Sequence, residues 1–467
     1  MSDGSISSPE ALYKFLRESK FKVLANIIFA GSPGHQIYEL DYFLRKLRVG
    51  DIPAGKYLWV QRNGSLTQTM LDVFNGQFRQ FNLGMICNDQ FYEMTTRILQ
   101  MAPEYGVDVG LSHLKNSVMS RAETFIARFA DDIYYNMTNE SVLRAHVDYF
   151  RLRSLTDDFE PWMAAAPPID EELSALLGGK TDKLAVVHFR TGTGNAGTPV
   201  PAESLYPTLE YLRDNGYTVV KIGTEAYPQE FARFGVINYS ESPLRNFRND
   251  LALLMHAKIA VINGSGLENI ADLVGVPFVS YARWHISLVT YSPKSVVVPT
   301  LLYDPQRKRL LSLAEQILFF KTRQEFWEGQ FFGWHFPIDR YIARPPQADE
   351  MLSAVQEAIS LGEAPRPLSP IQARFNKLDE TGVLAYVKGR VSDFFLNRFQ
   401  VLLDGASDAP APVEAPKVVE TAAPKAAAKP AVKAAVKPVK KVAAKPAAKK
   451  PASKPAKKPA AKTAKGK

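Results

Sequence analysis

The sequence predicts an α/β protein with two domains built on parallel sheets, followed by C-terminal helices and a disordered basic tail. Three observations predict this class. Short apolar runs typical of buried strands alternate with amphipathic segments of helical period. The chain has 467 residues, enough for two or three domains with cores of their own. Residues 411–467 are mostly Ala, Lys, Pro and Val and contain no aromatic residue.

The first domain is predicted over residues 1–165. It begins with the apolar run FKVLANIIFAG (21–31), which indicates a buried strand and ends in a Gly- and Pro-containing cluster. That cluster opens a helix, QIYELDYFLRKL (36–47), whose apolar residues recur on one face: Ile37, Leu40, Phe43, Leu44 and Leu47. A second strand is expected at residues 56–62, and further helices at 88–102 and 141–155. The Pro-rich segment 161–170 marks the crossing into the next domain.

The second domain, predicted over residues 166–365, alternates strand and helix more regularly. Strands are expected at residues 184–190, 217–223, 258–264 and 277–282. Helices are expected at residues 203–216, 249–257, 267–275 and 349–362. Strands that alternate with helices form parallel sheets with right-handed crossovers, so both domains are predicted to be Rossmann-like.

Residues 366–409 are predicted to form C-terminal helices, and residues 410–467 to be disordered. A chain of Ala, Lys and Pro buries too little apolar area to offset the entropy of ordering. The tail also dominates the net charge, because residues 411–467 hold 16 Lys and 2 Glu, which gives +14. Since the whole chain carries +9, the remainder carries −5 and is mildly acidic.

The cysteine count and the hydropathy pattern indicate in which cellular compartment the protein is expected. The single cysteine, Cys87, excludes an intramolecular disulfide framework and favours a reducing setting. The first residues, MSDGSISSPE, lack the basic and apolar regions of an export signal. No apolar run approaches the roughly 20 residues of a membrane-spanning helix. We expect a cytoplasmic protein without a transmembrane segment, with peripheral attachment at the inner membrane surface as an open alternative.

The segment LAVVHFRTGTGNAG carries the first candidate site. His188 and Arg190 are two residues apart on a predicted strand, so their side chains leave the same face near its carboxyl end. Ligands of parallel α/β sheets bind at that end. The planar fork of arginine grips phosphate through two hydrogen bonds, and histidine can donate another. The alternative for His188 is a satisfied core histidine, but the paired Arg190 favours a ligand site, because an arginine at the end of an apolar strand needs an anionic partner or water. Gly192 and Gly194 then let backbone N–H groups approach an anion closely.

The same glycines fit a dinucleotide fingerprint, G-x-G-x-x-G, which leaves an NAD-dependent oxidoreductase open as an interpretation. Two features count against it. Pro199 and Pro201 delay the helix that must begin within the glycines to meet a pyrophosphate. The acidic residue expected about 20 positions further on is absent, and the nearest candidate, Glu225, lies 28 positions beyond Gly197.

A second cluster follows the predicted strand 258–264. The run NGSGLEN supplies Asn263, Gly264, Ser265, Gly266 and Glu268 at the start of a helix. Its amides and serine hydroxyl are expected to hold a diphosphate, and the Glu268 carboxylate to accept hydrogen bonds from ribose hydroxyls. The alternative is that Glu268 only complements the helix dipole. Gly223, at the end of the strand 217–223, completes the predicted donor-binding set.

Residues 25–400 resemble a family of bacterial glycosyltransferases found among genes for surface-glycan assembly. The resemblance is carried by these segments: GSPGHQIYELDYFLRKL (31–47), VVHFRTGTGNAG (186–197), LYPTLEYLRDNGYTVVKIGTE (205–225), RNDLALLMHAKIAVINGSGLENIADLVGVPFV (248–279) and DFFLNRFQVLL (393–403). It implies the two-domain GT-B architecture, with the donor in the C-terminal domain and the acceptor facing the N-terminal one. HFRTG is also similar to the H-x-R-x-G-D motif of fucosyltransferases that use GDP-fucose, although Thr193 stands where that motif has an acidic residue.

The expected reaction is transfer of a sugar from a nucleotide-diphosphate donor to a glycan or protein acceptor. Arg190, the amides of residues 264–266 and His188 would stabilise charge on the departing nucleoside diphosphate. We expect neither a metal nor a cofactor. His35 is the first candidate for the base that activates the acceptor, with Glu39 and Asp41 as alternatives, because the pKa of histidine lies near working pH. A helix-start residue without chemistry is an equal interpretation of His35.

The tail supports a rival function. It resembles the C-terminal segments of linker-histone-like proteins, in which regularly spaced lysines neutralise phosphates without reading sequence. An anionic membrane surface or an acidic polysaccharide would attract it equally. The alternative is therefore a nucleic-acid or envelope-associated binding protein with an inactive core.

Overall fold

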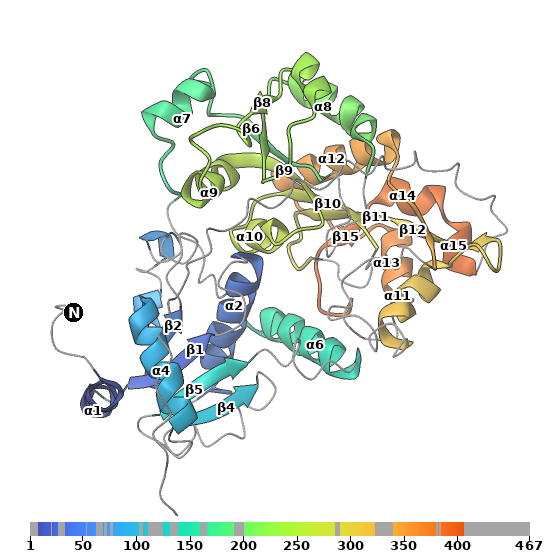
Figure 1. Ribbon diagram of the computed structural model, residues 1–467. Coiled ribbons are helices and arrows are strands. Elements are labelled where there is room, and N and C mark those ends of the chain that lie inside the picture. The colour runs from blue at the N-terminus through green and yellow to red at the C-terminus, as the bar shows by residue number, and fades with distance from the viewer. Residues whose placement is uncertain are drawn as a thin grey trace, which may run out of the picture. The chain divides into compact units, whose positions relative to one another are not determined.

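The computed structural model describes most of the chain up to residue 405 (Figure 1). The described residues are 8–19, 21–26, 33–52, 54–61, 69, 72–74, 78–101, 106–110, 125–130, 139–158, 166–190, 200–284, 290–322, 340–379, 382 and 384–405. They form two parallel sheets, of five and seven strands, and an antiparallel sheet of three strands. The predicted α/β class with two parallel-sheet units is confirmed. The predicted disordered tail lies outside the described residues.

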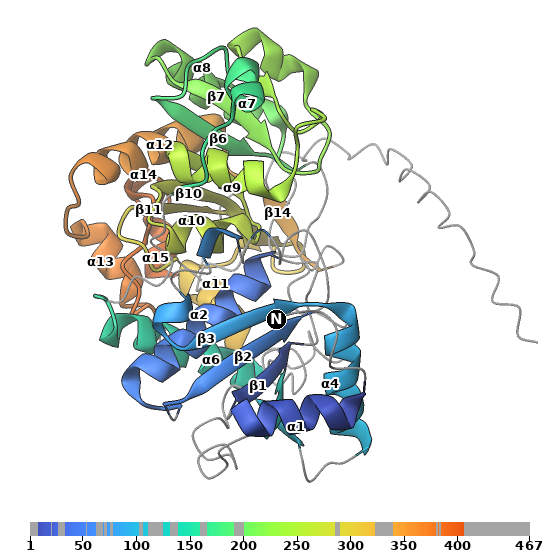
Figure 2. The same ribbon diagram turned by 90° about the vertical axis from the view of Figure 1, so that its left-hand side faces the viewer.

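The five-stranded sheet belongs to the N-terminal part of the chain. Its strands are β1 (Phe21–Asn26), β2 (Lys56–Gln61), β3 (Leu83–Cys87), β4 (Gly106–Gly110) and β5 (Phe125–Ala130). They lie in the order β3-β2-β1-β5-β4, and every neighbouring pair is parallel. α4 (Asp89–Met101) packs against β1, β2, β4 and β5, with α1 (Pro9–Ser19) beside it (Figure 2). α2 (Pro33–Val49) packs on α6 (Asn139–Leu155).

α2 shows why its segment is helical. Proline is favoured at the first helical position, and the helix begins at Pro33, earlier than the predicted start at Gln36. Leu47 of the predicted apolar face is partly buried. The other four residues of this face are buried: Ile37, Leu40, Phe43 and Leu44. The Phe43 ring packs edge-on against Tyr57 of β2 at 5.1 Å between centroids. Burial of this face therefore fixes the helix on the sheet.

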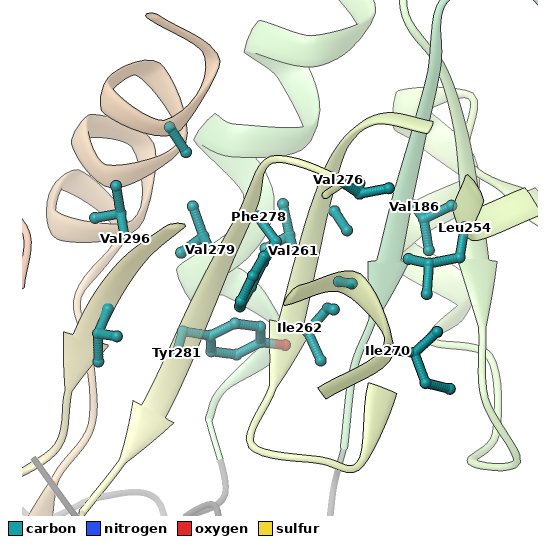
Figure 3. Close-up of a cluster of buried hydrophobic side chains, with 14 of the residues drawn as sticks. Val186, Leu254, Val261, Ile262, Ile270, Val276, Phe278, Val279, Tyr281 and Val296 are labelled. Carbon is teal, nitrogen blue, oxygen red and sulfur yellow. The ribbon is translucent and has the colours of Figure 1, made fainter. Parts of the chain in front are cut away.

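The seven-stranded sheet carries the second unit. Its strands are β6 (Leu184–His188), β7 (Thr218–Ile222), β8 (Ile237–Asn238), β9 (Ala257–Asn263), β10 (Phe278–Arg283), β11 (Ser295–Pro299) and β15 (Arg390–Val391). All neighbouring pairs are parallel. Its central strands are apolar on both sides, as expected for a sheet covered by helices on both faces. Figure 3 shows Val186, Val261 and Phe278 of neighbouring strands in this core.

Helices pack on this sheet from both faces (Figure 1). α12 (Ala348–Glu363) lies along β9, β10 and β11 and contacts α8 (Tyr206–Asp214). α9 (Phe247–His256) packs on β6 and β9, and α10 (Leu267–Leu273) packs on β9 and β10. Leu254 of α9 and Ile270 of α10 project into the core in Figure 3.

The strand order of this sheet, β15-β11-β10-β9-β6-β7-β8, sets the position of the site. From β6 the chain adds β7 and β8 on one side, and then returns to add β9, β10 and β11 on the other. The connections therefore diverge between β6 and β9. In open parallel sheets, ligands bind at the carboxyl ends of the strands beside such a switch.

Several elements were not predicted. They are β3, β4, β5, β8, β11, α1, the helices α7 (Glu171–Leu176) and α11 (Leu313–Thr322), and the antiparallel strands β12 (Leu301–Asp304), β13 (Arg309–Leu310) and β14 (Ile342–Arg344). The missed strands have two to six residues, too few for a period to show. The segment 366–409, predicted as helices, does contain α13 (Pro370–Asn376), α14 (Asp393–Arg398) and α15 (Val401–Asp404). It also supplies β15 to the seven-stranded sheet, so this sheet extends beyond the predicted boundary at residue 365.

Among the described helices, none combines the length and the apolar character that crossing a membrane requires.

Asp250 in α9 makes stability depend on pH. Burial raises the pKa of its carboxyl from 3.8 to about 6. A carboxyl whose pKa is higher in the folded state than in the unfolded state binds its proton more tightly when the protein is folded. The folding stability is therefore highest below about pH 4 and falls as the pH rises to about 6. We expect Asp250→Asn to remove that slope and to stabilise the protein at pH 7.5 by about 1–3 kcal/mol. Urea unfolding at pH 5 and 7.5 measures it.

The matched control is Asp214→Asn at the end of α8, whose side chain is 57% exposed. Its stability should stay within about 0.5 kcal/mol of the unmodified protein at both pH values. Equal stabilisation by the two variants would show that the effect is general to charge removal and does not come from the buried carboxyl.

Candidate functional site

Four strands of the seven-stranded sheet place polar residues at the same edge. His188 ends β6 and Arg190 follows it, Glu225 follows β7, Asn263 ends β9, and Arg283 ends β10. Parallel strands present their carboxyl ends together, so residues distant in sequence meet there. The edge contains the switch between β6 and β9.

Arg190 is held at this edge by two neighbours. Its Nε donates to Glu225 Oε1 at 3.1 Å, and its Nη1 donates to the carbonyl oxygen of Gly264 at 3.4 Å. The side chain stays 27% exposed. Arginine has five N–H donors, and among the described residues these two contacts use two of them. The remaining N–H groups are of the kind that binds anions in other proteins.

His188 shares the same carboxylate. Its Nε2 lies 3.7 Å from Glu225 Oε2, so both side chains reach one face of the sheet, as expected from their spacing. The imidazole is 3% exposed. Burial lowers its pKa to about 4, with Arg190 and Lys221 acting in the same direction, so the ring is neutral at pH 7. The ring is buried beside Glu225, and the predicted contact between His188 and the donor stays a prediction.

Gly223 is needed for this packing. Its φ of +99° lies in the region that side chains disfavour, and an added Cβ would lie 2.7 Å from His188 Cδ2 and 3.0 Å from Glu225 Oε2. The glycine therefore lets the backbone after β7 pass against the imidazole. The sequence placed Gly223 in the donor-binding set, and the structure gives it a steric role.

Sequence reasoning missed two cations at this edge. Lys221 of β7 is fully buried, and its Nζ donates to the carbonyl oxygen of Glu225. Burial lowers its pKa to about 8. Arg245 donates from Nη1 to the carbonyl oxygen of Gly223 at 3.4 Å and is exposed. The available signal was the lysine itself, since a charged residue inside the apolar run YTVVKIG requires a polar partner.

In residues 263–268, two of the backbone N–H groups that were predicted to bind a ligand form hydrogen bonds within the protein. Asn263 is fully buried, Gly264 N donates to the carbonyl oxygen of Tyr281 at 3.3 Å, and Ser265 N donates to Glu268 Oε1 at 3.3 Å. Ser265 Oγ accepts from the N–H of Leu267 at 3.2 Å. Two of the three amides expected to hold a diphosphate are thus engaged within the protein. Ser265 and Gly266 remain half-buried at the surface of this edge.

Glu268 is buried in an ion pair with Arg283. Its side chain is fully buried and pairs with Arg283 Nη2 at 2.5 Å. Burial raises the pKa of this carboxyl, although the charge of Arg283 acts against the rise. The side chain has no exposed surface, and the predicted hydrogen bonds of Glu268 to ribose hydroxyls stay a prediction. Glu268 ties α10 to β10 and closes the loop over Ser265.

The remaining predicted residues divide into two groups. Gly192, Gly194 and the rest of their loop lie outside the described residues. His35 is the third residue of α2 and not part of a loop, and its side chain and that of Glu39 are also outside the described part. Within the described residues, no group of three or more His, Cys, Asp or Glu side chains could hold a metal ion.

Asp41, an alternative candidate for the acceptor base, is held inside the N-terminal unit. It is fully buried, and its Oδ2 accepts from Arg45 Nε at 2.8 Å and from the Tyr149 hydroxyl at 2.8 Å. Although burial acts to raise its pKa, the charges of Arg45 and Arg153 bring the pKa below its usual value. A carboxylate whose pKa is lowered is a weaker proton acceptor than one with the usual pKa. Asp41 therefore joins α2 to α6.

No protein-family model matches the chain, and no curated protein matches it. Three similar solved structures can be named. A glycosyl transferase family 9 protein from Veillonella parvula is 14% identical over 73% of this chain and 98% of that chain, with a TM-score of 0.39. The heptosyltransferase WaaC of E. coli with ADP is 14% identical over 60% and 90%, at 0.33. The iron-containing dodecameric glycosyltransferase TibC of enterotoxigenic E. coli is 16% identical over 59% and 62%, at 0.35. With TM-scores below 0.5, these likenesses carry no argument for the site.

Proposed function

We propose that this protein is a glycosyltransferase that moves a sugar from a nucleotide-diphosphate donor to a glycan or protein acceptor. The donor diphosphate would bind at the carboxyl edge of the seven-stranded sheet. One observation supports this most: Arg190, a guanidinium at the β6/β9 switch, is held by Glu225 and by the carbonyl of Gly264 and stays 27% exposed. The family resemblance of residues 186–197 and 248–279 supports the same assignment.

The proposed chemistry is electrostatic. The bond between the anomeric carbon and the β-phosphate oxygen breaks, and a bond to the acceptor oxygen forms. Arg190 stabilises the charge that gathers on the leaving diphosphate, because a preorganised donor is worth more at a partly desolvated edge than in water. The acceptor loses its proton to a base, for which we retain His35 in the first turn of α2. We propose that neither a metal nor a cofactor takes part.

Nucleotide binding tests the proposal. Thermal-shift measurements with GDP, UDP, dTDP, CMP and NAD should show stabilisation by a nucleoside diphosphate, since a ligand of the folded state raises its stability with occupancy. We expect Arg190→Ala to weaken that binding about 10- to 100-fold, the range for a hydrogen bond between charged groups. Titration calorimetry gives the dissociation constants.

Two controls separate the alternatives. Arg213→Ala, an exposed arginine paired with Glu210 and Asp214, should leave nucleotide binding unchanged. Deletion of residues 411–467 should also leave it unchanged, whereas the rival function places all binding in the tail. A response to NAD alone would favour the dinucleotide interpretation and contradict the proposal.

A further inference from the structure

Glu225 is a carboxylate at this edge that contacts two of the predicted site residues. Its Oε1 accepts from Arg190 Nε at 3.1 Å, and its Oε2 lies 3.7 Å from His188 Nε2. Its backbone carbonyl accepts from Lys221. The residue is therefore fixed at both its side chain and its main chain. No role in a site was predicted for it.

We infer that Glu225 is the positioning residue of the anion site, which holds the Arg190 guanidinium so that its outer N–H edge faces the diphosphate. This inference rests on the proposed function. The guanidinium is planar, so contacts at Nε and Nη1 fix the direction of every remaining N–H group. Without Glu225, the Arg190 side chain can rotate about several bonds in the free protein. It must then lose this conformational entropy when the ligand binds, which weakens binding.

The surrounding charges allow a carboxylate to do this without repelling the ligand. Lys221 carries a proton at pH 7 because its pKa is about 8, and Arg245 adds a further cation near Lys221 and the carbonyl of Gly223. Against these stand Glu225 and Glu241, whose charge also acts on Lys221. Among the described residues, the Arg283–Glu268 pair of this edge is neutral as a unit. The cations Arg190, Lys221 and Arg245 then exceed the carboxylates Glu225 and Glu241 by one positive charge, so the field still favours an anion.

His188 contributes by its shape and neutrality. Since its pKa is about 4, it brings no competing positive charge to Glu225 at pH 7. Its ring fills the space behind the carboxylate, against Gly223. The Glu225 carboxylate therefore has an uncharged imidazole on one side and the Arg190 guanidinium as its charged partner.

The experiment is a double-mutant cycle in the full chain with inorganic pyrophosphate as the probe, measured by titration calorimetry. Pyrophosphate tests the diphosphate subsite without depending on the base or the sugar. We expect Glu225→Ala to raise the dissociation constant about 10-fold, within the range of coupling between residues in contact. Glu225→Gln keeps an acceptor for Arg190 Nε and should stay within about 3-fold of the unmodified protein.

The same Glu225→Ala change is then made in an Arg190→Lys background. Lysine is a point charge that needs no fixed fork, so there Glu225→Ala should change the dissociation constant less than about 2-fold. A purely structural role of Glu225 would weaken binding equally in both backgrounds. Glu210→Ala, an exposed carboxylate paired with Arg213, is the matched control and should have no effect.

The outcomes are distinct. Equal weakening in both backgrounds, no weakening, or tighter binding by Glu225→Ala overturns the inference and leaves the proposed function standing. Failure of the unmodified protein to bind pyrophosphate and every nucleoside diphosphate overturns both. If Glu225→Ala does not fold, as seen by circular dichroism, the Gln variant decides, because a loss of more than about 10-fold in a folded Glu225→Gln protein contradicts positioning through a hydrogen bond.

Discussion

Gly223→Ala is expected to destabilise the protein by about 2–5 kcal/mol and to disrupt the anion site. Two effects add. An L-residue at positive φ costs about 1–2 kcal/mol, and the new methyl group must displace a buried imidazole, which costs about 1–3 kcal/mol more. The Cβ would lie 2.7 Å from His188 Cδ2 and 3.0 Å from Glu225 Oε2. Moving either group changes the carboxylate that holds Arg190.

Urea unfolding followed by circular dichroism measures the loss of stability, and calorimetry with pyrophosphate measures the loss of binding. Gly216→Ala is the matched control, because Gly216 has a φ of +76° and no atom within 4 Å of an added Cβ. It should show the backbone cost of about 1–2 kcal/mol and unchanged binding. If the two variants were equally stable and bound pyrophosphate alike, the contact between Gly223 and His188 would have no energetic weight.

Arg153→Met is expected to destabilise the protein by about 3–5 kcal/mol. Arg153 is at the C-terminal end of α6, and its side chain and that of Asp272 in α10 are 7% and 8% exposed. The two form an ion pair, and the guanidinium lies 4.2 Å from the centroid of the Tyr291 ring. Removing the arginine leaves the Asp272 carboxylate in a poorly solvated place with only the N–H of Ser292, at 2.6 Å, as a remaining described donor.

The double variant Arg153→Met/Asp272→Asn distinguishes a lost ion pair from a packing defect. It removes the uncompensated carboxylate and should recover more than half of the lost stability, measured as the midpoint of urea unfolding. Arg213→Met is the exposed control and should cost no more than about 1 kcal/mol, because surface ion pairs contribute little. No recovery in the double variant would assign the loss to packing against Tyr291.

Part of the site was visible in the sequence for a simple reason. The spacing of two between His188 and Arg190 is a local property of a strand, and the structure brings both to one carboxylate. Glu225 was noted only as a poor fit to a dinucleotide fingerprint. It lies 35 residues from Arg190, and only the pairing of β6 with β7 brings them together.

The strong periodic segments were equally visible. α2, α4, α6 and α12 have long apolar faces, and β6, β7, β9 and β10 are apolar runs between polar breaks, so burial alone specifies them. The short edge elements were missed. β8 and β15 have two residues each and exist only because a neighbouring strand supplies hydrogen-bond partners.

By itself, the sequence determined the α/β class, the alternation of strands and helices in the second unit, and the face on which His188 and Arg190 lie. These follow from hydrophobic period, which each segment carries in its own residues. Only the tertiary structure decided which of the candidate polar groups are open to a ligand. Glu268 is buried against Arg283 of β10, and Asp41 is buried against Arg45 of its own helix and Tyr149 of α6. Arg190 is left half-buried beside a carboxylate that follows the next strand. Burial and charge pairing depend on contacts between segments distant in sequence, and no local pattern records them.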